Sequence, residues 1–401
     1  MSRLFLLVVL VFVGQPSLAQ TPVTFSPNPG NLVMLEHVPA GTRSPLPLVL
    51  VLHGCSQDRG YADDVGLLGL ADARGFAVVI AETSSGNNSS RCFNWFESGD
   101  ITPGSGEQRS LLAMVESMKA RHDIDDARVF VTGVSSGGAM TAMLLATAPD
   151  VFAAGATFAG VPFRCGLGVT NAFSCMNGGV DKTQAQWAAL VEDNVVHDGA
   201  WPRLMVVHGS SDSTVRPKNA DDLALQFTGL HGLTTTPTST STAGGITTKR
   251  WLVDDREIVT TVLIDGMGHG TPVDPPVCGS VGAFVLDEDL CGSALAVDFF
   301  GLFASGEGEG EGEGEEMASG QQGGEGQGQE AQRGEGRDPL GREGERNTGS
   351  GDNVESDQGL GRAHLERLRS HQLQQELRRR GAERERTPVE LDYIDRLLRR
   401  F

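Results

Sequence analysis

Residues 128–140 read RVFVTGVSSGGAM, and this stretch decides the fold. It opens with the apolar, β-prone run Val129 to Val131, which is typical of a buried strand. The pentapeptide GVSSG follows at 133–137, and good helix formers continue from 139 to 148. Strand, G-x-S-x-G and helix in this order predict a nucleophile elbow, with Ser135 on a sharp turn at a helix N-terminus. A Ser/Gly-rich turn without chemistry is the alternative, and the flanking strand and helix argue against it.

The remaining chain alternates strand-like and helix-like segments. Residues 46–52, LPLVLVL, form a nearly continuous apolar run, as expected for a strand buried on both faces of a mainly parallel sheet. Other apolar runs or amphipathic stretches recur at 63–74, 76–80, 107–121, 152–162, 204–208 and 260–264. This alternation predicts an α/β fold in which helices flank a mainly parallel central sheet.

The first 19 residues have the features of a cleaved secretory signal peptide. Arg3 precedes an apolar run at 4–13, and small residues close the segment at 17–19. The run is too short to span a bilayer, so we expect no stable membrane anchor. Six cysteines in an exported chain predict up to three disulfides and an extracellular or periplasmic location. The formal net charge of −20 argues against nucleic acid as a partner.

The mature chain divides into a catalytic domain at 20–303 and a tail. Residues 304–362 are dominated by Gly, Glu and Gln, and so few apolar side chains predict a disordered linker. Residues 363–401 predict a short amphipathic helical segment, with a capping box at 387–390 and an apolar stripe behind it. We expect a solvated helix, or one that docks an unknown partner, rather than a catalytic element. The tail resembles the carboxyl-terminal tails of large, uncharacterised alphaproteobacterial membrane proteins, which implies no activity.

A serine nucleophile needs a base, and the base needs an acid that orients it. His269 lies in a Gly-rich loop just after the apolar run at 260–264, and Asp212 lies just after the run at 204–208. Ser135, Asp212 and His269 follow one another in the chain order of α/β-hydrolases. Spacing leaves Asp254 and Asp265 open as alternative acids.

Two other histidines follow buried strands, and we expect structural roles for both. His208 ends the run at 204–208 and suits a hydrogen bond at a strand end. His53 ends the run at 46–52 and suits a brace under the oxyanion hole. The hole itself needs two backbone N–H donors, which we assign to Ser136 and Cys55.

Trp95 and Phe96 are open to two interpretations. They either present an aromatic wall to the acyl group of the substrate or belong to the hydrophobic core. The sequence contains no C-x-x-C pair and no His-Cys cluster, so neither a metal nor a cofactor is expected.

The motifs, taken in order, resemble those of the secreted poly(3-hydroxybutyrate) depolymerase and feruloyl esterase family over roughly residues 21–303. Besides the elbow, they are LHGCSQ at 52–57, RCFNWF at 91–96, AGVPFRC at 159–165, FSCM at 173–176, HGSSDSTVRPKNA at 208–220, GMGHGTPV at 266–273 and FFGL at 299–302. The resemblance implies an α/β-hydrolase fold, the Ser135–Asp212–His269 triad and oxyanion donors at Cys55 and Ser136. The family's usual Ser-Ala-Gly elbow reads Ser-Ser-Gly here.

The resemblance also implies how the six cysteines pair. The implied disulfides are Cys55–Cys92, Cys165–Cys175 and Cys278–Cys291. Short loops favour the last two pairs independently of the family, whereas six cysteines alone allow fifteen connectivities.

These observations predict an exported serine hydrolase that cleaves carboxylic esters. Polyhydroxyalkanoate polyester or its oligomers are the first expected substrate, and feruloyl or acetyl esters of plant polysaccharide are the alternative. A non-catalytic interaction protein on a hydrolase scaffold is a third hypothesis, against which the intact Ser, Asp and His argue. No polymer-binding module is recognisable after the catalytic domain.

Overall fold

The structure is a computed structural model that describes residues 22–275 and 277–303. The predicted signal peptide at 1–19, the linker at 304–362 and the helical tail at 363–401 lie outside the described residues. No helix within the described part of the chain is long and apolar enough to cross a membrane.

In the described residues, ten strands form one central sheet in the order β1-β2-β4-β3-β5-β6-β7-β10-β9-β8. The run from β4 to β10 is parallel, and the strands at both edges are antiparallel. A separate parallel pair joins β11 and β12. The bounds are β1 Pro22–Val23, β2 Val33–His37, β3 Leu46–Leu52, β4 Ala77–Glu82, β5 Ile124–Val134, β6 Ala154–Phe158, β7 Arg203–Gly209, β8 Ser239–Ala243, β9 Ile246–Val253, β10 Arg256–Ile264, β11 Thr271–Val273 and β12 Val285–Asp287.

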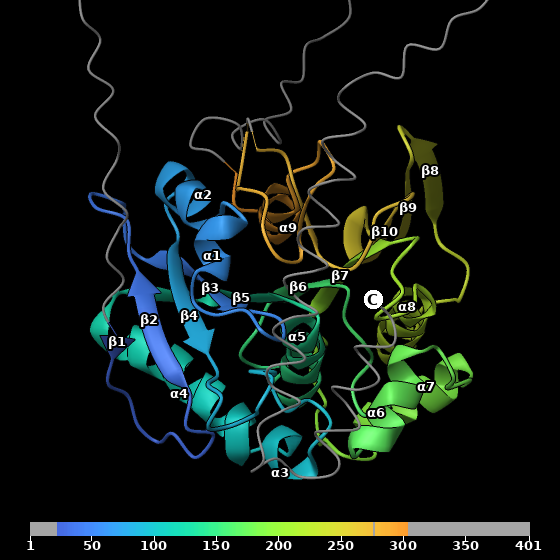
Figure 1. Ribbon diagram of the computed structural model, residues 1–401, viewed down its shortest axis with the longest axis horizontal. Helices are drawn as coiled ribbons and strands as arrows, with labels where there is room; N and C mark the ends of the chain where they lie inside the picture. The colour runs from blue at the N-terminus through green and yellow to red at the C-terminus, as the bar shows by residue number, and fades with distance from the viewer. Residues whose placement is uncertain (1–21, 276, 304–401) are drawn as a thin grey trace, which may run out of the picture. The chain divides into compact units, whose positions relative to one another are not determined.

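Helices cover both faces of the sheet, with α1, α2 and α9 on one side and α4, α5 and α8 on the other (Figure 1). The alternation of side chains along β3 shows why two cores form: Leu48 and Leu50 belong to one, Val49 and Val51 to the other. The bounds are α1 Tyr61–Asp64, α2 Leu67–Arg74, α3 Ser98–Ile101, α4 Gly106–Arg121, α5 Ser136–Thr147, α6 Val169–Met176, α7 Gln184–Glu192, α8 Lys218–Leu230 and α9 Gly292–Phe300.

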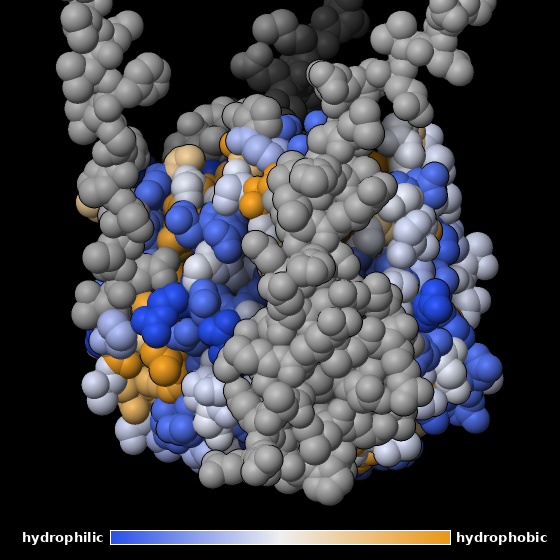
Figure 2. Space-filling model, viewed as in Figure 1, coloured by the Kyte–Doolittle hydropathy of each residue, from blue (hydrophilic) through white to orange (hydrophobic). Residues whose placement is uncertain are grey.

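The predicted α/β fold is confirmed, with one difference in detail. The helical stretch predicted at 63–74 is two short helices, α1 and α2, because Gly66 between them adopts a left-handed φ of 73°. A side chain there would also come within 2.6 Å of the backbone nitrogen of Gly279. On the face drawn in Figure 2, the described surface is mostly hydrophilic, with hydrophobic residues in small patches.

Candidate active site

Ser135 stands between β5 and α5 in a backbone conformation that few residues adopt. Its φ is 56° and its ψ is −115°, while all twelve residues of α5 are buried. The turn is possible because glycines flank it: a Cβ on Gly133 would lie 2.6 Å from the backbone of Gly137, and one on Gly137 would lie 2.3 Å from the carbonyl oxygen of Leu52. The predicted strand–turn–helix context is therefore present, and the turn holds Ser135 in strained geometry.

The loops that carry Asp212 and His269 are held together by their own backbones. They follow β7 and β10, which are adjacent parallel strands and so end at the same edge of the sheet. The N–H of Ser210 donates to the carbonyl of Ile264 at 2.9 Å, and that of Ser211 donates to the carbonyl of Met267 at 3.0 Å. Residues 57 positions apart in the chain thereby become neighbours.

The three predicted residues form one hydrogen-bonded chain. His269 Nε2 lies 2.9 Å from Ser135 Oγ, and His269 Nδ1 lies 2.7 Å from Asp212 Oδ2. The ring of Phe284 contacts the imidazole in a T-shaped arrangement with centroids 5.7 Å apart. This is the arrangement in which a histidine can accept a proton from serine while a carboxylate orients the ring.

Asp212 is held as a carboxylate by donors on all sides. Its Oδ1 accepts the N–H groups of Thr214 and Val215, each at 2.9 Å. Burial by itself raises the pKa of Asp212, but hydrogen bonds from His208 and His269 outweigh it and hold that pKa well below its usual range. The negative charge needed to orient and stabilise an imidazolium is thus available at any ordinary pH.

The other candidates raised by the sequence have different surroundings. Asp265 accepts the hydroxyl of Ser210 at 2.9 Å, and Asp254 lies in the turn between β9 and β10 with a φ of 48°. His208 is fully buried at the end of β7, where its Nε2 lies 2.8 Å from the carbonyl of Val215 and 3.4 Å from Asp212 Oδ2. Neither of these aspartates is bonded to His269. His208 contacts the carboxylate of Asp212.

His53 joins the loop after β3 to the end of β4. Its Nε2 accepts the N–H of Thr83 at 3.2 Å, which leaves Nδ1–H to donate to the carbonyl of Gly54 at 2.7 Å. Burial lowers the pKa of His53 to about 4, so the ring is neutral at neutral pH and can keep both bonds. It braces the loop that contains Cys55.

The loop that begins at Cys55 is fixed from two directions. Cys55 is disulfide-bonded to Cys92, and the N–H of Ser56 donates to the carbonyl of Ser90 at 2.8 Å. Ser136 is the first residue of α5, so its N–H lies in the helical turn that lacks intrahelical acceptors. The other disulfides are Cys165–Cys175 and Cys278–Cys291, and all three pairs are those that the resemblance implies.

Gln57 is a site residue to which the sequence analysis assigned no role. Its Oε1 accepts the N–H of Gly54 at 2.8 Å, and its Nε2 donates to the carbonyl of Ala283 at 2.8 Å. Ala283 precedes Phe284, the residue packed on His269. Gln57 therefore ties the Cys55 loop to the segment that contacts His269. It lies within the motif LHGCSQ, but only the fold shows what it reaches.

Trp95 and Phe96 differ in their environments. Trp95 is buried and belongs to the core on the α4–α5 side of the sheet, while Phe96 is partly buried against that core. Their rings meet edge-on with centroids 5.5 Å apart. The environment of Trp95 is that of a core residue, whereas Phe96 is partly exposed. Within residues 22–275 and 277–303, no group of three or more His, Cys, Asp or Glu side chains is placed to hold a metal ion.

The sequence of the described domain matches a known family. Residues 33–249 match the family model described as esterase PHB depolymerase. The chain belongs to this esterase family. It is accordingly a carboxylic-ester hydrolase, and the predicted family is confirmed. A second match, to a domain of unknown function (DUF4175), spans residues 309–401, which lie outside the described residues.

The relatives of this chain are named for different ester substrates. Poly(3-hydroxyalkanoate) depolymerase C of Paucimonas lemoignei is 45% identical over 309 residues, which cover 75% of each chain. Feruloyl esterase B of Talaromyces stipitatus is 30% identical over 262 residues, 63% of this chain and 72% of the relative. The solved structure of the acetyl xylan esterase from Aspergillus awamori is similar with a TM-score of 0.62 and 27% identity, covering 71% of this chain and all of the other.

Proposed function

We propose that the esterase cleaves polyhydroxyalkanoate polyester or its oligomers, with Ser135 as nucleophile, His269 as base and Asp212 as the orienting acid. The observation that carries the catalytic assignment is the continuous chain from Ser135 Oγ through His269 to Asp212, with contacts of 2.9 and 2.7 Å. The 45% identity to a poly(3-hydroxyalkanoate) depolymerase supports the choice of substrate.

In the proposed reaction, Ser135 Oγ attacks the ester carbonyl while its proton passes to His269 Nε2. Asp212 holds Nδ1–H and stabilises the imidazolium that forms. The backbone N–H groups of Ser136 and Cys55 bind the oxyanion of the tetrahedral intermediate. His269 then protonates the leaving alcohol, and water, activated by the same imidazole, hydrolyses the acyl-enzyme.

Feruloyl or acetyl esters of plant polysaccharide form the second candidate substrate class. Relatives named for these activities are less similar than the depolymerase, at 27–31% identity. The comparison is direct: kcat/KM of one preparation on hydroxybutyrate trimer, methyl ferulate and acetylated xylan. A preference for the trimer supports the polyester proposal. A preference for methyl ferulate or acetylated xylan overturns the polyester proposal but leaves the triad assignment unaffected.

The Ser135→Ala variant tests the triad. We expect turnover of p-nitrophenyl butyrate to fall on the order of 10⁴-fold or more, because triad members act as a unit. Ser239→Ala, on the exposed edge strand β8, is the matched control and should keep full activity. Circular dichroism should show both variants folded. A Ser135→Ala protein that retained a tenth of the rate would overturn the assignment and would support a non-catalytic or differently built site.

The proposal also covers where the esterase acts and how its chain is divided. Three disulfides in the described residues suit an oxidising compartment, which supports export through residues 1–19 to the extracellular space or the periplasm. Residues 20–303 form the catalytic domain, 304–362 a linker and 363–401 a helical segment for an unknown partner. Export is tested by the mass of the secreted protein, which should begin near Gln20.

A further inference from the structure

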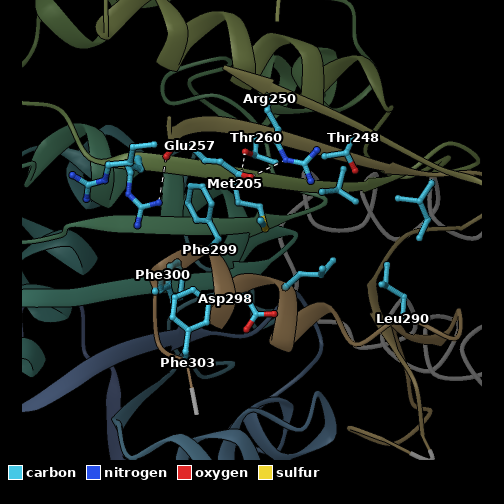
Figure 3. A pocket seen from close by; sticks show the side chains of 16 residues that line it. Met205, Thr248, Arg250, Glu257, Thr260, Leu290, Asp298, Phe299, Phe300 and Phe303 are labelled. Carbon is cyan, nitrogen blue, oxygen red and sulfur yellow. Dashed lines mark hydrogen bonds and ion pairs between the residues drawn. The ribbon is translucent and has the colours of Figure 1, made fainter. Parts of the chain in front are cut away.

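A cavity of about 580 Å³ lies between α9 and the strands β7, β10 and β9, away from the triad. Figure 3 shows how it is built: Phe299 and Phe300 come from α9, while Met205, Thr260 and Arg250 come from the strands facing them. The cavity exists because α9 packs over β6 and β7, whereas the sheet continues beyond the helix to β10 and β9.

The inner surface of the cavity is mostly hydrocarbon. Met205 and Val262 form its floor, and Leu295 and Phe299 form the wall on α9. A volume of this size and an apolar lining suit an organic molecule of moderate length. Water alone makes a poor occupant of such a surface.

Two of the three arginines in its lining, Arg203 and Arg256, have no carboxylate partner among the described residues. Arg203 Nε is buried and has no hydrogen-bond partner among the described residues, and Nη1 reaches only the backbone carbonyl of Glu257 at 3.3 Å. The guanidinium lies 4.5 Å from the centre of the Phe299 ring. Arg256, also in the lining, is exposed and makes no ion pair within the part of the chain that the structure describes.

Both carboxylates in the lining already have partners, and one of them, Asp298, is paired with Arg74. Glu257 Oε1 accepts from Arg250 at 2.7 Å, and Oε2 accepts from Thr260 at 2.8 Å. Burial and then the charge of Arg256 lower the pKa of Arg203 to about 10, so this guanidinium stays charged at neutral pH. In a chain of net charge −20, an unneutralised pair of arginines beside an apolar cavity indicates attraction for an anion.

The geometry points to a binding site for an amphipathic monocarboxylic acid, its carboxylate at Arg203 and Arg256 and its hydrocarbon body along Met205 and Phe299. Planar guanidinium groups suit carboxylates, and the cavity suits the tail. Carboxylic acids are also what ester hydrolysis releases, so the enzyme generates ligands of this class.

The site is separate from the catalytic one. Arg203 and Arg256 are the first residues of β7 and β10, whereas the loops of Asp212 and His269 follow the last residues of the same strands. A strand of seven residues puts its two ends about 20 Å apart. A ligand bound at the arginines therefore does not occupy the acyl site.

Calorimetric titration of the full mature chain tests the proposal, with the Ser135→Ala substitution present so that no ester is consumed. Octanoate should bind at one site, and octan-1-ol, which lacks the charge, should bind at least tenfold more weakly. Free hydroxybutyrate trimer forms a second arm: tighter binding than octanoate identifies a product site, and weaker binding a fatty-acid site. Both results support a carboxylate site.

Variants localise the binding. Arg256→Gln should weaken octanoate binding about fivefold or more, since a charge-assisted contact is lost, and Thr248→Trp, which fills the cavity, should weaken it at least tenfold. Arg43→Gln, at an exposed arginine on another part of the surface, should stay within twofold. With Ser135 intact, all three should keep kcat/KM on p-nitrophenyl butyrate within twofold. Three results would each overturn the proposal. Octanoate could bind no more weakly to the two cavity variants, octanol could bind as tightly as octanoate, or millimolar octanoate could fail to bind at all.

Discussion

Gln57 acts on the site through two backbone groups rather than by contacting the reacting atoms. It is bonded both to Gly54, just before the proposed oxyanion donor Cys55, and to Ala283, just before the residue that packs on His269. One side chain thus links the loop of the proposed oxyanion donor to the segment beside the proposed base. A positioning role of this kind affects the transition state more than substrate binding.

We expect Gln57→Ala to lower kcat on p-nitrophenyl butyrate by about 10- to 100-fold while KM stays within twofold, since small misplacements of catalytic groups cost rates of this order. Gln186→Ala removes a glutamine that caps α7 far from the triad and should leave kcat within twofold. Steady-state kinetics of both variants decide the matter. A Gln57→Ala enzyme with unchanged kcat, or with a raised KM alone, would contradict the positioning role.

Glu107 is a buried acid that the proposed mechanism does not use. Its side chain is 0% exposed, Oε2 accepts the N–H of Asn94 at 2.8 Å, and Oε1 has no partner among the described residues. Burial raises the pKa of Glu107 from 4.5 to about 8. The folded protein therefore keeps the proton at neutral pH, whereas the unfolded chain has released it.

This difference makes stability depend on pH. Between about pH 4.5 and 8 the native state holds a proton that the unfolded state lacks, so the contribution of Glu107 is fully present below that window and is lost as pH rises through it. We expect the urea midpoint to fall from pH 6.5 to 8, and Glu107→Gln, which is neutral throughout, to fall less. Glu192→Gln, at an exposed position, should follow the wild type. Parallel curves for wild type and Glu107→Gln would refute the assignment.

At the scale of elements, the loop between β3 and α1 depends on a covalent link to a distant loop. The Cys55–Cys92 bond spans 37 residues, a closure worth about 4 kcal/mol in the chain-entropy model. His53 and Gln57 add hydrogen bonds on either side of it. The proposed oxyanion donor Cys55 therefore lies on a loop that is held by tertiary contacts rather than by regular structure.

Loss of this disulfide should affect activity before it affects the fold. We expect the Cys55→Ser, Cys92→Ser double variant to lose up to about 10²- to 10³-fold in kcat, the cost of removing one oxyanion donor, with far-ultraviolet circular dichroism unchanged at 25 °C. The Cys165→Ser, Cys175→Ser pair, between α6 and the loop before it, is the matched control and should lose less. If the two double variants had equal kinetics, the role proposed for the Cys55–Cys92 disulfide would be wrong. A count of free thiols in the wild type checks that all six cysteines are bonded.

At the scale of the whole molecule, everything the proposed reaction uses lies before residue 304. The triad, the three disulfides and both cores belong to residues 22–303. We therefore expect a chain of residues 20–303 to hydrolyse p-nitrophenyl butyrate with kcat within about twofold of the full mature chain. Matched preparations compared by kinetics and thermal unfolding test this. A folded but inactive shorter chain would disprove the domain boundary.

The sequence alone predicted the parts of this protein that depend on local pattern. Apolar runs such as 46–52 report burial on both faces of a sheet, and G-x-S-x-G between a strand and a helix reports a turn that side chains at 133 and 137 would block. Each of these features depends on residues that are close together in the chain, so the sequence pattern alone predicts it. The choice between Asp212 and the other aspartates was narrowed by chain order and by resemblance, but spacing left it open.

Only the tertiary structure brings together groups that the chain separates. The bond from His269 to Asp212 depends on β7 and β10 being neighbours, and the bond from Gln57 to Ala283 spans 226 positions. The burial of Glu107, and that of the Arg203 Nε that finds no partner among the described residues, likewise depend on which elements pack over them. Local patterns identify the strands, the elbow and the candidate groups, whereas the pairing of strands and the covering of their faces are long-range contacts that leave no local signal in the sequence.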